Sequence, residues 1–217
     1  MNILLIGNSY TSRNDLAQLL EGLCRENGKQ AQVFRVTQGG RKMFQYKDPE
    51  DPMTDHLTAV LQERQYDVVI LQDQSLLPIL NFDAFLEGMC YVGNLVQPHT
   101  ARTILYATWA RKAGNIDLET NGWTPESMTQ MLASAYMKAA DALGAEVSSV
   151  GVSFQKVVEM APEIDLYDSD LYHPSYLGSC LAALTHYYTI FGEYPKHTES
   201  LLLDVSVRSA FQTAVCR

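Results

Sequence analysis

The sequence has no excess of positive charge. Its 217 residues include 16 lysine and arginine residues against 25 aspartate and glutamate residues, which gives a formal net charge of −9 at pH 7. Nucleic acids and anionic membrane surfaces bind clusters of lysine and arginine, and the sequence contains no such stripe. No apolar run reaches the length of a membrane-spanning helix either. We therefore expect neither nucleic acid nor a membrane as a partner.

Cysteine is scarce and widely spaced, at Cys24, Cys90, Cys180 and Cys216. This spacing fits neither a zinc site nor a redox pair, so we expect free thiols, mostly buried, as in a reducing compartment. The chain also enters an apolar run at once, without the charged region and cleavage site of an export signal. As it stands, the sequence predicts a cytoplasmic protein, and export stays open if a signal was removed.

The signatures of three enzyme classes are missing. The sequence has no Gly-x-Ser-x-Gly elbow, no phosphate-binding P-loop and no Gly-x-Gly-x-x-Gly after its first apolar run. Their absence argues against a lipase-type α/β-hydrolase and against an NAD enzyme. Hydrophobic residues make up 47% of the chain, and no linker rich in proline, glycine or serine divides it. We predict a single domain over 1–217.

Short apolar runs alternate with segments of helical length. This alternation predicts a five-stranded parallel sheet with helices on both faces, a three-layer α/β/α sandwich with flavodoxin-like strand order. The strand-like runs lie at 3–6, 31–36, 68–71, 103–107 and 146–150, and helices are expected near 54–65, 83–96, 125–143 and 174–191.

Two helix ends carry recognisable signals. Ser12 followed by Asp15 resembles an N-cap with an acid in the first turn, so the first helix should begin just after it and end near Gly28. Pro174 is a favoured first-turn residue. It should open the helix near 174–191, with His173 at the entrance.

Three residues suggest nucleophilic chemistry. Ser9 follows the first apolar run, so it should lie at the carboxyl end of a strand, where ligands bind in open parallel sheets. A serine hydroxyl needs a base within hydrogen-bond reach and a further group to orient that base. His173 suits the first role, and Asp170, three residues earlier, suits the second. In isolation, each residue is equally well explained by a turn, a cap or solvation.

These blocks resemble those of the SGNH (GDSL-like) hydrolases. The match consists of Gly-Asn-Ser at 7–9, a glycine at 39–40, a side-chain amide after the third strand, and Asp-x-x-His-Pro at 170–174. Asn8 stands where the family has aspartate, and Gln-Asp-Gln-Ser at 72–75 replaces Gly-x-Asn-Asp. The Gln-Asp-Gln-Ser form is similar to a bacterial subgroup associated with carbohydrate ester hydrolysis.

The resemblance implies a set of donors for an oxyanion. Acyl transfer needs such donors, usually backbone amides aided by a side-chain amide. The Ser9 amide is the first. The loop after the second strand offers Gly40, favoured by register with the family, with Gly39 as the backup. Alignment places Gln74 at the family's asparagine position, and Gln72 is its backup.

Aromatic and basic residues flank the expected site. Tyr10 and Tyr172 neighbour the proposed catalytic residues, while Trp109 and Arg111 follow the fourth strand. Aromatic planes beside a polar site suit sugar stacking, although Trp109 could instead be a core residue. Arg111 could bind an acidic substrate group or be solvated.

The resemblance therefore implies a serine ester hydrolase that forms an acyl-enzyme and needs no metal or organic cofactor. We expect it to remove a short acyl group, in the first place acetyl, from a carbohydrate or another polar alcohol. The alternatives are a lipid or thioester esterase, a glycan-binding module with a degenerate site, and a flavodoxin-like cofactor domain. A metal-ligand cluster is a further alternative, formed by Asp165, Asp168, Asp170 and His173. The oligomeric state is not predicted.

Overall fold

The computed structural model describes residues 1–216, and a parallel sheet lies at the centre of the molecule. Its strand order is β2-β1-β3-β4-β5, the flavodoxin-like order predicted from the sequence. Every pair is parallel, and the register sets Ile6 beside Val36 and Leu71. The strands are β1 Asn2–Gly7, β2 Gln32–Thr37, β3 Val68–Leu71, β4 Thr103–Tyr106 and β5 Glu146–Ser148.

Helices fill the connections between the strands and extend beyond the last strand. The α-helices are α1 Ser9–Ser12, α2 Leu16–Glu26, α3 Pro52–Glu63, α4 Leu77–Leu80, α5 Phe82–Val96, α6 Ile116–Asn121, α7 Pro125–Leu143, α8 Val150–Met160, α9 Tyr176–Phe191 and α10 Val205–Cys216. Short 3-10 turns are η1 Arg13–Asp15, η2 Met43–Lys47, η3 Gln97–His99 and η4 Glu199–Leu201.

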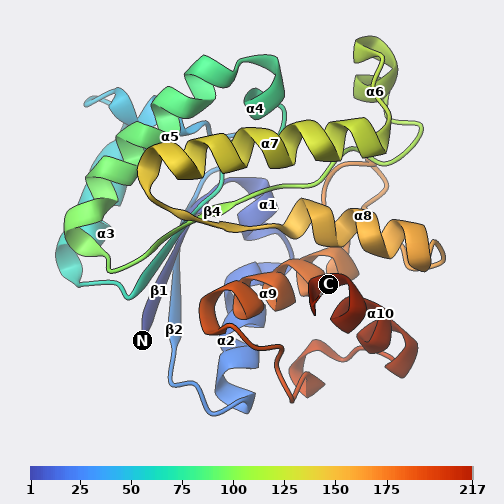
Figure 1. The fold of residues 1–217 in the computed structure, drawn as a ribbon. Helices are drawn as coiled ribbons and strands as arrows, with labels where there is room; N and C mark the ends of the chain where they lie inside the picture. Colours follow the sequence, from blue (N-terminus) through green and yellow to red (C-terminus); the bar gives the residue numbers. More distant parts are fainter. Residues whose placement is uncertain (217) are drawn as a thin grey trace.

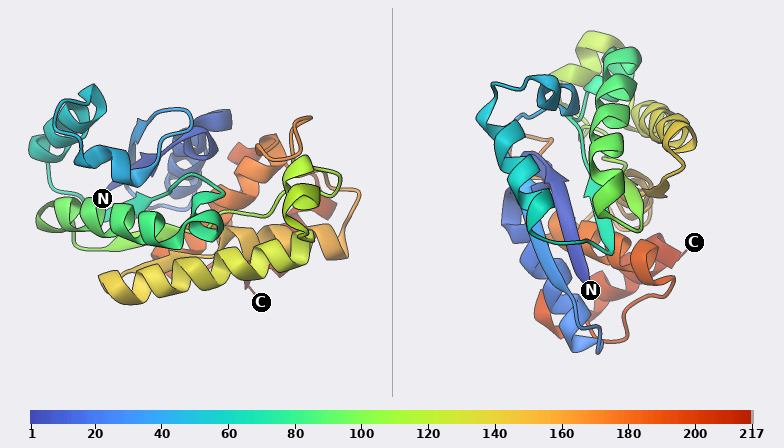
Figure 2. Two further views of the ribbon diagram at one scale, coloured as in Figure 1. Left: turned by 90° about the horizontal axis from the view of Figure 1, so that it is seen from above. Right: turned by 90° about the vertical axis from the view of Figure 1, so that its left-hand side faces the viewer.

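The sheet is covered on both faces, which completes the three layers (Figures 1 and 2). Alternate strand residues point to opposite faces, so Leu5 and Ile70 pack under α2, α8 and α9. Leu4 and Leu71 pack on the other face, under α3, α5 and α7. Both clusters are buried, as a strand with apolar residues on its two sides requires.

The first helix begins differently from the prediction. Ser12 makes no side-chain cap, and Asn14 and Asp15 both have φ of 53°, in the left-handed region. The chain therefore forms α1 directly at Ser9, kinks through η1, and only then enters α2. The capping pattern at Ser12 was a misleading local signal.

The helix after His173 also begins later than predicted. Ser175 is its N-cap, with its side chain accepting a hydrogen bond from the Gly178 amide, so α9 starts at Tyr176 rather than at Pro174. His173 and Pro174 belong to the loop before the helix. Helices α8 and α10 were not predicted, although Ser149 and Asp204, residues of types favoured at N-caps, directly precede them.

The remaining sequence expectations concern surfaces and thiols. All four cysteines are free, but only Cys24 and Cys180 are buried, so burial is less general than expected. In residues 1–216, no helix combines the length and apolar character needed to cross a bilayer.

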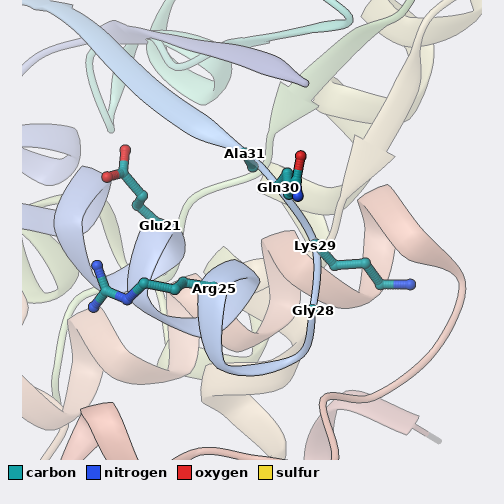
Figure 3. A pocket seen from close by; sticks show the side chains of 6 residues that line it. All are labelled: Glu21, Arg25, Gly28, Lys29, Gln30 and Ala31. Carbon is teal, nitrogen blue, oxygen red and sulfur yellow. The ribbon is translucent and has the colours of Figure 1, made fainter.

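A hollow lined by Glu21, Arg25 and the turn from Gly28 to Ala31 lies before β2 (Figure 3). This hollow lies at the amino end of the strands, whereas Ser9 lies at their carboxyl end.

Candidate active site

Ser9 lies where β1 ends and α1 begins. Asn8 is the N-cap of α1: its side-chain oxygen accepts a hydrogen bond from the Tyr10 amide at 3.2 Å, and its Nδ2 donates to the carbonyl of Arg41 at 3.0 Å. An aspartate could accept the first bond but could not donate the second. Asn8 thus suits this position, where the family has aspartate. The amide of Ser9, in the first turn, has no hydrogen-bond partner among residues 1–216.

Gly7 makes this sharp turn possible. A Cβ atom at that position would lie 2.4 Å from Thr11 Oγ1 and 2.6 Å from Gln72 Oε1. Both distances are far below van der Waals contact, so any larger residue would push α1 or the Gln72 side chain away. The glycine lets Ser9 stand immediately beyond the strand, close to the loop after β3.

The turn from Asp170 to His173 forms one tight unit. Asp170 Oδ1 accepts hydrogen bonds from the amides of Tyr172 at 3.1 Å and His173 at 2.9 Å. Leu171, in the middle, has φ of 65°, an uncommon conformation for a residue with a branched side chain. Such strain is often found at functional sites. The result is that the carboxylate is held against the imidazole of the same turn.

The three predicted catalytic residues meet in a hydrogen-bonded row. His173 Nδ1 lies 2.6 Å from Asp170 Oδ2, and His173 Nε2 lies 2.8 Å from Ser9 Oγ. With Nδ1–H donated to the carboxylate, Nε2 is left to accept the serine hydroxyl, the tautomer that a general base requires. Burial raises the pKa of Asp170, but the hydrogen bonds from His173 and the two amides outweigh it and hold that pKa below its usual value.

The loop after β2 reaches this site through Asn8. Gly40 has φ of 70° and no atom within 4 Å of a Cβ position, and it is exposed. Its amide has no hydrogen-bond partner among residues 1–216. Gly39 has no positive φ, so Gly40 is the position at which the turn requires glycine. The Asn8–Arg41 bond fixes the residue directly after Gly40 to the turn that carries Ser9.

The two glutamines after β3 have different environments. Gln72 is fully buried: its Oε1 accepts from the Asn8 amide and from Thr11 Oγ1, both at 2.9 Å, and its Nε2 donates to the Asp73 carbonyl. Gln74 is partly exposed, and its Oε1 accepts from the Leu76 and Leu77 amides at 2.9 Å. These bonds hold the side chain of Gln74 by its oxygen. Its Nε2 has no hydrogen-bond partner among the described residues.

Trp109 is not placed to bind substrate. Its side chain is 0% exposed, stacked between Tyr10 at 4.5 Å and Phe154 at 4.1 Å between ring centroids. Its Nε1 donates to the carbonyl of Tyr172 at 3.0 Å. The strand-end position placed Trp109 at the correct edge of the sheet, but the chain turns its ring inward. Trp109 is therefore a core residue beneath the Asp170–His173 turn.

Tyr10 and Arg111 are also buried, at 3% exposure each. Arg111 Nη1 donates to the Tyr10 hydroxyl at 2.6 Å and to Ser75 Oγ at 3.0 Å, while Nε donates to Asp117 at 2.7 Å. A guanidinium that is buried and paired in this way is not a solvated group. Burial raises the pKa of Tyr10 to about 12, although Arg111 opposes this effect.

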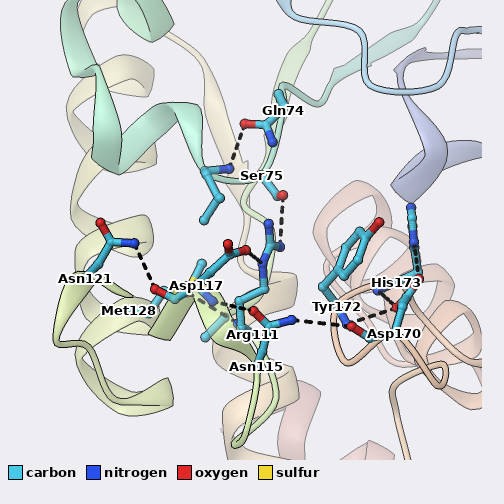
Figure 4. A network of polar contacts seen from close by, with 12 residues as sticks. Gln74, Ser75, Arg111, Asn115, Asp117, Asn121, Met128, Asp170, Tyr172 and His173 are labelled. Atoms are coloured by element: carbon cyan, nitrogen blue, oxygen red, sulfur yellow. Dashed lines mark hydrogen bonds and ion pairs between the residues drawn. The ribbon is translucent and has the colours of Figure 1, made fainter. Parts of the chain in front are cut away.

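Tyr172 is the one predicted contact residue whose ring stays partly exposed. It lies against His173, with 4.2 Å between ring centroids, and Arg111 packs over its ring at 4.9 Å. Figure 4 shows the surrounding polar network, in which Asn115 donates to the Asp170 carbonyl at 3.4 Å. Asn115 and Asp117 were not predicted. The only sequence signal was the N-cap pattern before α6.

The carboxylates near the Asp170–His173 turn are engaged with basic residues. Asp165 pairs with Lys112 at 2.8 Å and Asp168 pairs with Arg13 at 2.5 Å. Burial raises the pKa of Asp165, but its hydrogen bonds from Lys112 and the Tyr167 amide lower it below the usual value. Among residues 1–216, no group of at least three histidine, cysteine or acidic side chains is placed to hold a metal ion. The metal-cluster alternative thus has no geometric support.

Comparisons with family models and with curated proteins gave no match, whereas solved structures do match. A protein from Slackia heliotrinireducens, described as a candidate SGNH hydrolase, is 27% identical, with a TM-score of 0.77 over 88% of this chain and 98% of its own. A DUF4886 family protein from Bacteroides uniformis has a TM-score of 0.82 at 18% identity, covering 99% and 93%. An acetylxylan esterase from Geobacillus stearothermophilus has a TM-score of 0.66 at 15% identity, covering 90% and 96%.

These similarities extend over nearly the whole chain and concern one architecture. The Slackia protein, a GDSL-like lipase candidate from Parabacteroides merdae and the Geobacillus protein are described as hydrolases or esterases, whereas the Bacteroides protein is described only by its DUF4886 family. The chain therefore has the α/β fold of the SGNH and GDSL-like hydrolases, and it carries a hydrogen-bonded row of Ser9, His173 and Asp170 at the carboxyl edge of its sheet.

Proposed function

We propose that the protein is a serine ester hydrolase with Ser9 as its nucleophile. The observation that carries the proposal is the row Ser9 Oγ, His173 Nε2, His173 Nδ1 and Asp170 Oδ2, with separations of 2.8 and 2.6 Å. A serine hydroxyl is a weak nucleophile unless a base takes its proton as it attacks. The row supplies that base and the carboxylate that orients it.

The reaction proceeds in two halves. His173 takes the proton of Ser9 as Oγ attacks the acyl carbonyl, and Asp170 stabilises the imidazolium that forms. His173 then returns the proton to the departing alcohol, leaving an acyl-enzyme. Water, deprotonated by the same imidazole, releases the acid and restores Ser9.

The developing oxyanion needs hydrogen-bond donors that are not already engaged. The amides of Ser9 and Gly40 and the Nε2 of Gln74 meet this condition. Gln72 does not, because both ends of its side chain are already bonded in the interior. We therefore assign Gln74 as the third donor and Gln72 as part of the support for Ser9. Each donor of this kind contributes roughly 10²- to 10³-fold to kcat.

We propose a short acyl group, first of all acetyl, on a carbohydrate or another polar alcohol. Support comes from the polar character of the donor loops: Gln38, two residues before Gly40, is exposed, and the proposed donor Gln74 is partly exposed. The partly exposed ring of Tyr172, next to His173, offers a face for sugar stacking. Two of the similar structures are described as acetylxylan esterases.

A fluorophosphonate and a series of esters test this function. Mass spectrometry should find a single adduct on Ser9 in the wild type and none in Ser9→Ala. Acetyl, butyryl and octanoyl p-nitrophenyl esters should be hydrolysed with falling kcat/KM, and acetylated sugars should release acetate. Tyr172→Ala should raise KM for the sugar esters more than for the aryl acetate, with Tyr91→Ala on α5 as the exposed aromatic control.

Each rival predicts a different outcome. A folded protein that neither reacts with the fluorophosphonate nor hydrolyses any ester would be the degenerate binding module. Faster turnover of the octanoyl ester, with no acetate released from sugars, would favour a lipid or thioester substrate. A visible absorbance band of bound flavin would favour the flavodoxin-like alternative.

A further inference from the structure

Asp73 is an acidic side chain inside the protein that the proposed mechanism does not use. It is 0% exposed, yet it lies between the buried Gln72 and the partly exposed Gln74. Its Oδ1 accepts two backbone hydrogen bonds, from the Met43 amide at 2.9 Å and from the Gln74 amide at 2.7 Å. One oxygen atom thus joins two loops that are far apart in the sequence.

Those two loops carry the proposed oxyanion donors. Met43 begins η2, three residues after Gly40, and is therefore the far anchor of the loop after β2. That anchor cannot easily shift, because η2 packs on α5 so closely that a Cβ at Gly88 would lie 2.4 Å from the Phe44 amide nitrogen. On the other side, Asp73 holds the main chain of the same Gln74 whose side chain presents Nε2.

We propose that Asp73 is the positioning residue of the oxyanion hole, whose single carboxylate oxygen sets the spacing between the loop of Gly40 and the loop of Gln74. The inference rests on the proposed function. Asp73 does not touch substrate in this proposal and acts through the two donors. A change of about 1 Å in such a spacing is enough to weaken hydrogen bonds that form fully only in the transition state.

The chemistry of the side chain fits a positioning role. Holding two amides at once requires an oxygen with two free lone pairs, which aspartate and asparagine both supply. The second oxygen, Oδ2, has no hydrogen-bond partner among residues 1–216, and neither does the nearby Tyr136 hydroxyl. Burial raises the pKa of the Asp73 carboxyl to about 7, although the two amides and Lys42 oppose this. The acceptor geometry matters here rather than the charge.

A double-mutant cycle with Gln74 separates positioning from general stability. Asp73→Ala should lower kcat on p-nitrophenyl acetate by about 10- to 100-fold and change KM by less than about threefold, as loss of transition-state contacts predicts. Asp73→Asn should recover most of that loss. In the Gln74→Ala background, Asp73→Ala should cost clearly less than it does in the wild type, because one of the two donors that it positions is already gone. Should Asp73→Ala not fold, Asp73→Ser replaces it in the cycle. The serine hydroxyl oxygen lies one bond nearer the main chain than the carboxylate oxygen, so it should not hold both amides.

Leu184→Ala, fully buried in α9, is the matched control: it should destabilise the fold and leave kcat within about twofold. An unimpaired kcat in Asp73→Ala overturns the assignment, and so does a loss that is equally large in the Gln74→Ala background. Asp73→Asn as defective as Asp73→Ala overturns it too. A wild type without esterase activity or Ser9 labelling overturns the proposed function and this inference together, whereas the other outcomes overturn the inference alone.

Discussion

Trp109→Ala is expected to destabilise the fold, because the indole is a core element beneath the Asp170–His173 turn. The ring is 0% exposed and stacked at nearly zero tilt between Tyr10 and Phe154. Replacing such a tryptophan by alanine costs about 3–5 kcal/mol in lost burial and cavity formation. The Tyr172 carbonyl, which loses the indole donor at 3.0 Å, adds about 1 kcal/mol. Together these correspond to a fall in Tm of roughly 10–20 °C for a chain of this size.

Urea unfolding followed by far-UV circular dichroism measures this loss. Fluorescence is unsuitable, since the chain has two tryptophans and the variant removes one. Trp123→Ala is the matched control: Trp123 is only partly buried, against a small satellite cluster, and should cost less than about 2 kcal/mol. KM for acetylated sugars should change by less than about threefold in Trp109→Ala. An unfolding free energy within about 1 kcal/mol of wild type, with KM raised tenfold or more, would show instead that Trp109 binds substrate.

Ser9→Ala should lower kcat on short aryl esters by roughly four to six orders of magnitude without unfolding the protein, and His173→Ala should do about the same. The double variant should be little worse than either, and multiplicative losses would show that the two residues act independently. Gln74→Ala should lower kcat by about 10²- to 10³-fold with little change in KM. Gln72→Ala should instead lower the free energy of unfolding by about 2 kcal/mol, since it removes a buried acceptor, and the reverse ranking would exchange their roles. Burial raises the pKa of Asp73 to about 7, so between about pH 4 and 7 the folded chain binds the proton that the unfolded chain releases. The unfolding free energy of wild type relative to Asp73→Asn should therefore fall as pH rises through this window, by about 4 kcal/mol in all. A difference that is constant with pH in urea titrations would contradict the raised pKa.

The strand-end position of Ser9 and the pairing of Asp170 with His173 were accessible from local sequence patterns, whereas the meeting of Ser9 with His173 was expected from the resemblance to the SGNH hydrolases. A buried run followed by Gly-Asn-Ser fixes Ser9 at a strand end, and parallel strands end at one edge. The Asp170–His173 spacing fits a single turn.

The contacts of Trp109 and Arg111 could not be predicted in the same way. A position after a strand fixes the edge at which a residue lies, but not whether its side chain turns inward or outward. Trp109 turns inward because Tyr10 and Phe154 leave a slot between their rings. Arg111 is buried because Asp117, on a short helix without a strong sequence signal, pairs with it. Side-chain burial of this kind depends on packing between distant segments.

The hydrogen-bonded row of Ser9, His173 and Asp170 joins segments that are far apart in the chain. Asp170 and His173 are three residues apart and form their contact within one turn, whereas Ser9 lies 164 residues from its histidine. The Asp170–His173 contact closes almost no loop. The Ser9–His173 contact forms only when β1 is paired in the sheet and the loop before α9 packs beside it. During refolding, regained activity would thus follow the closure of the whole chain rather than the formation of its helices. Cleavage in the loop before α9 would abolish turnover even where the sheet stayed intact.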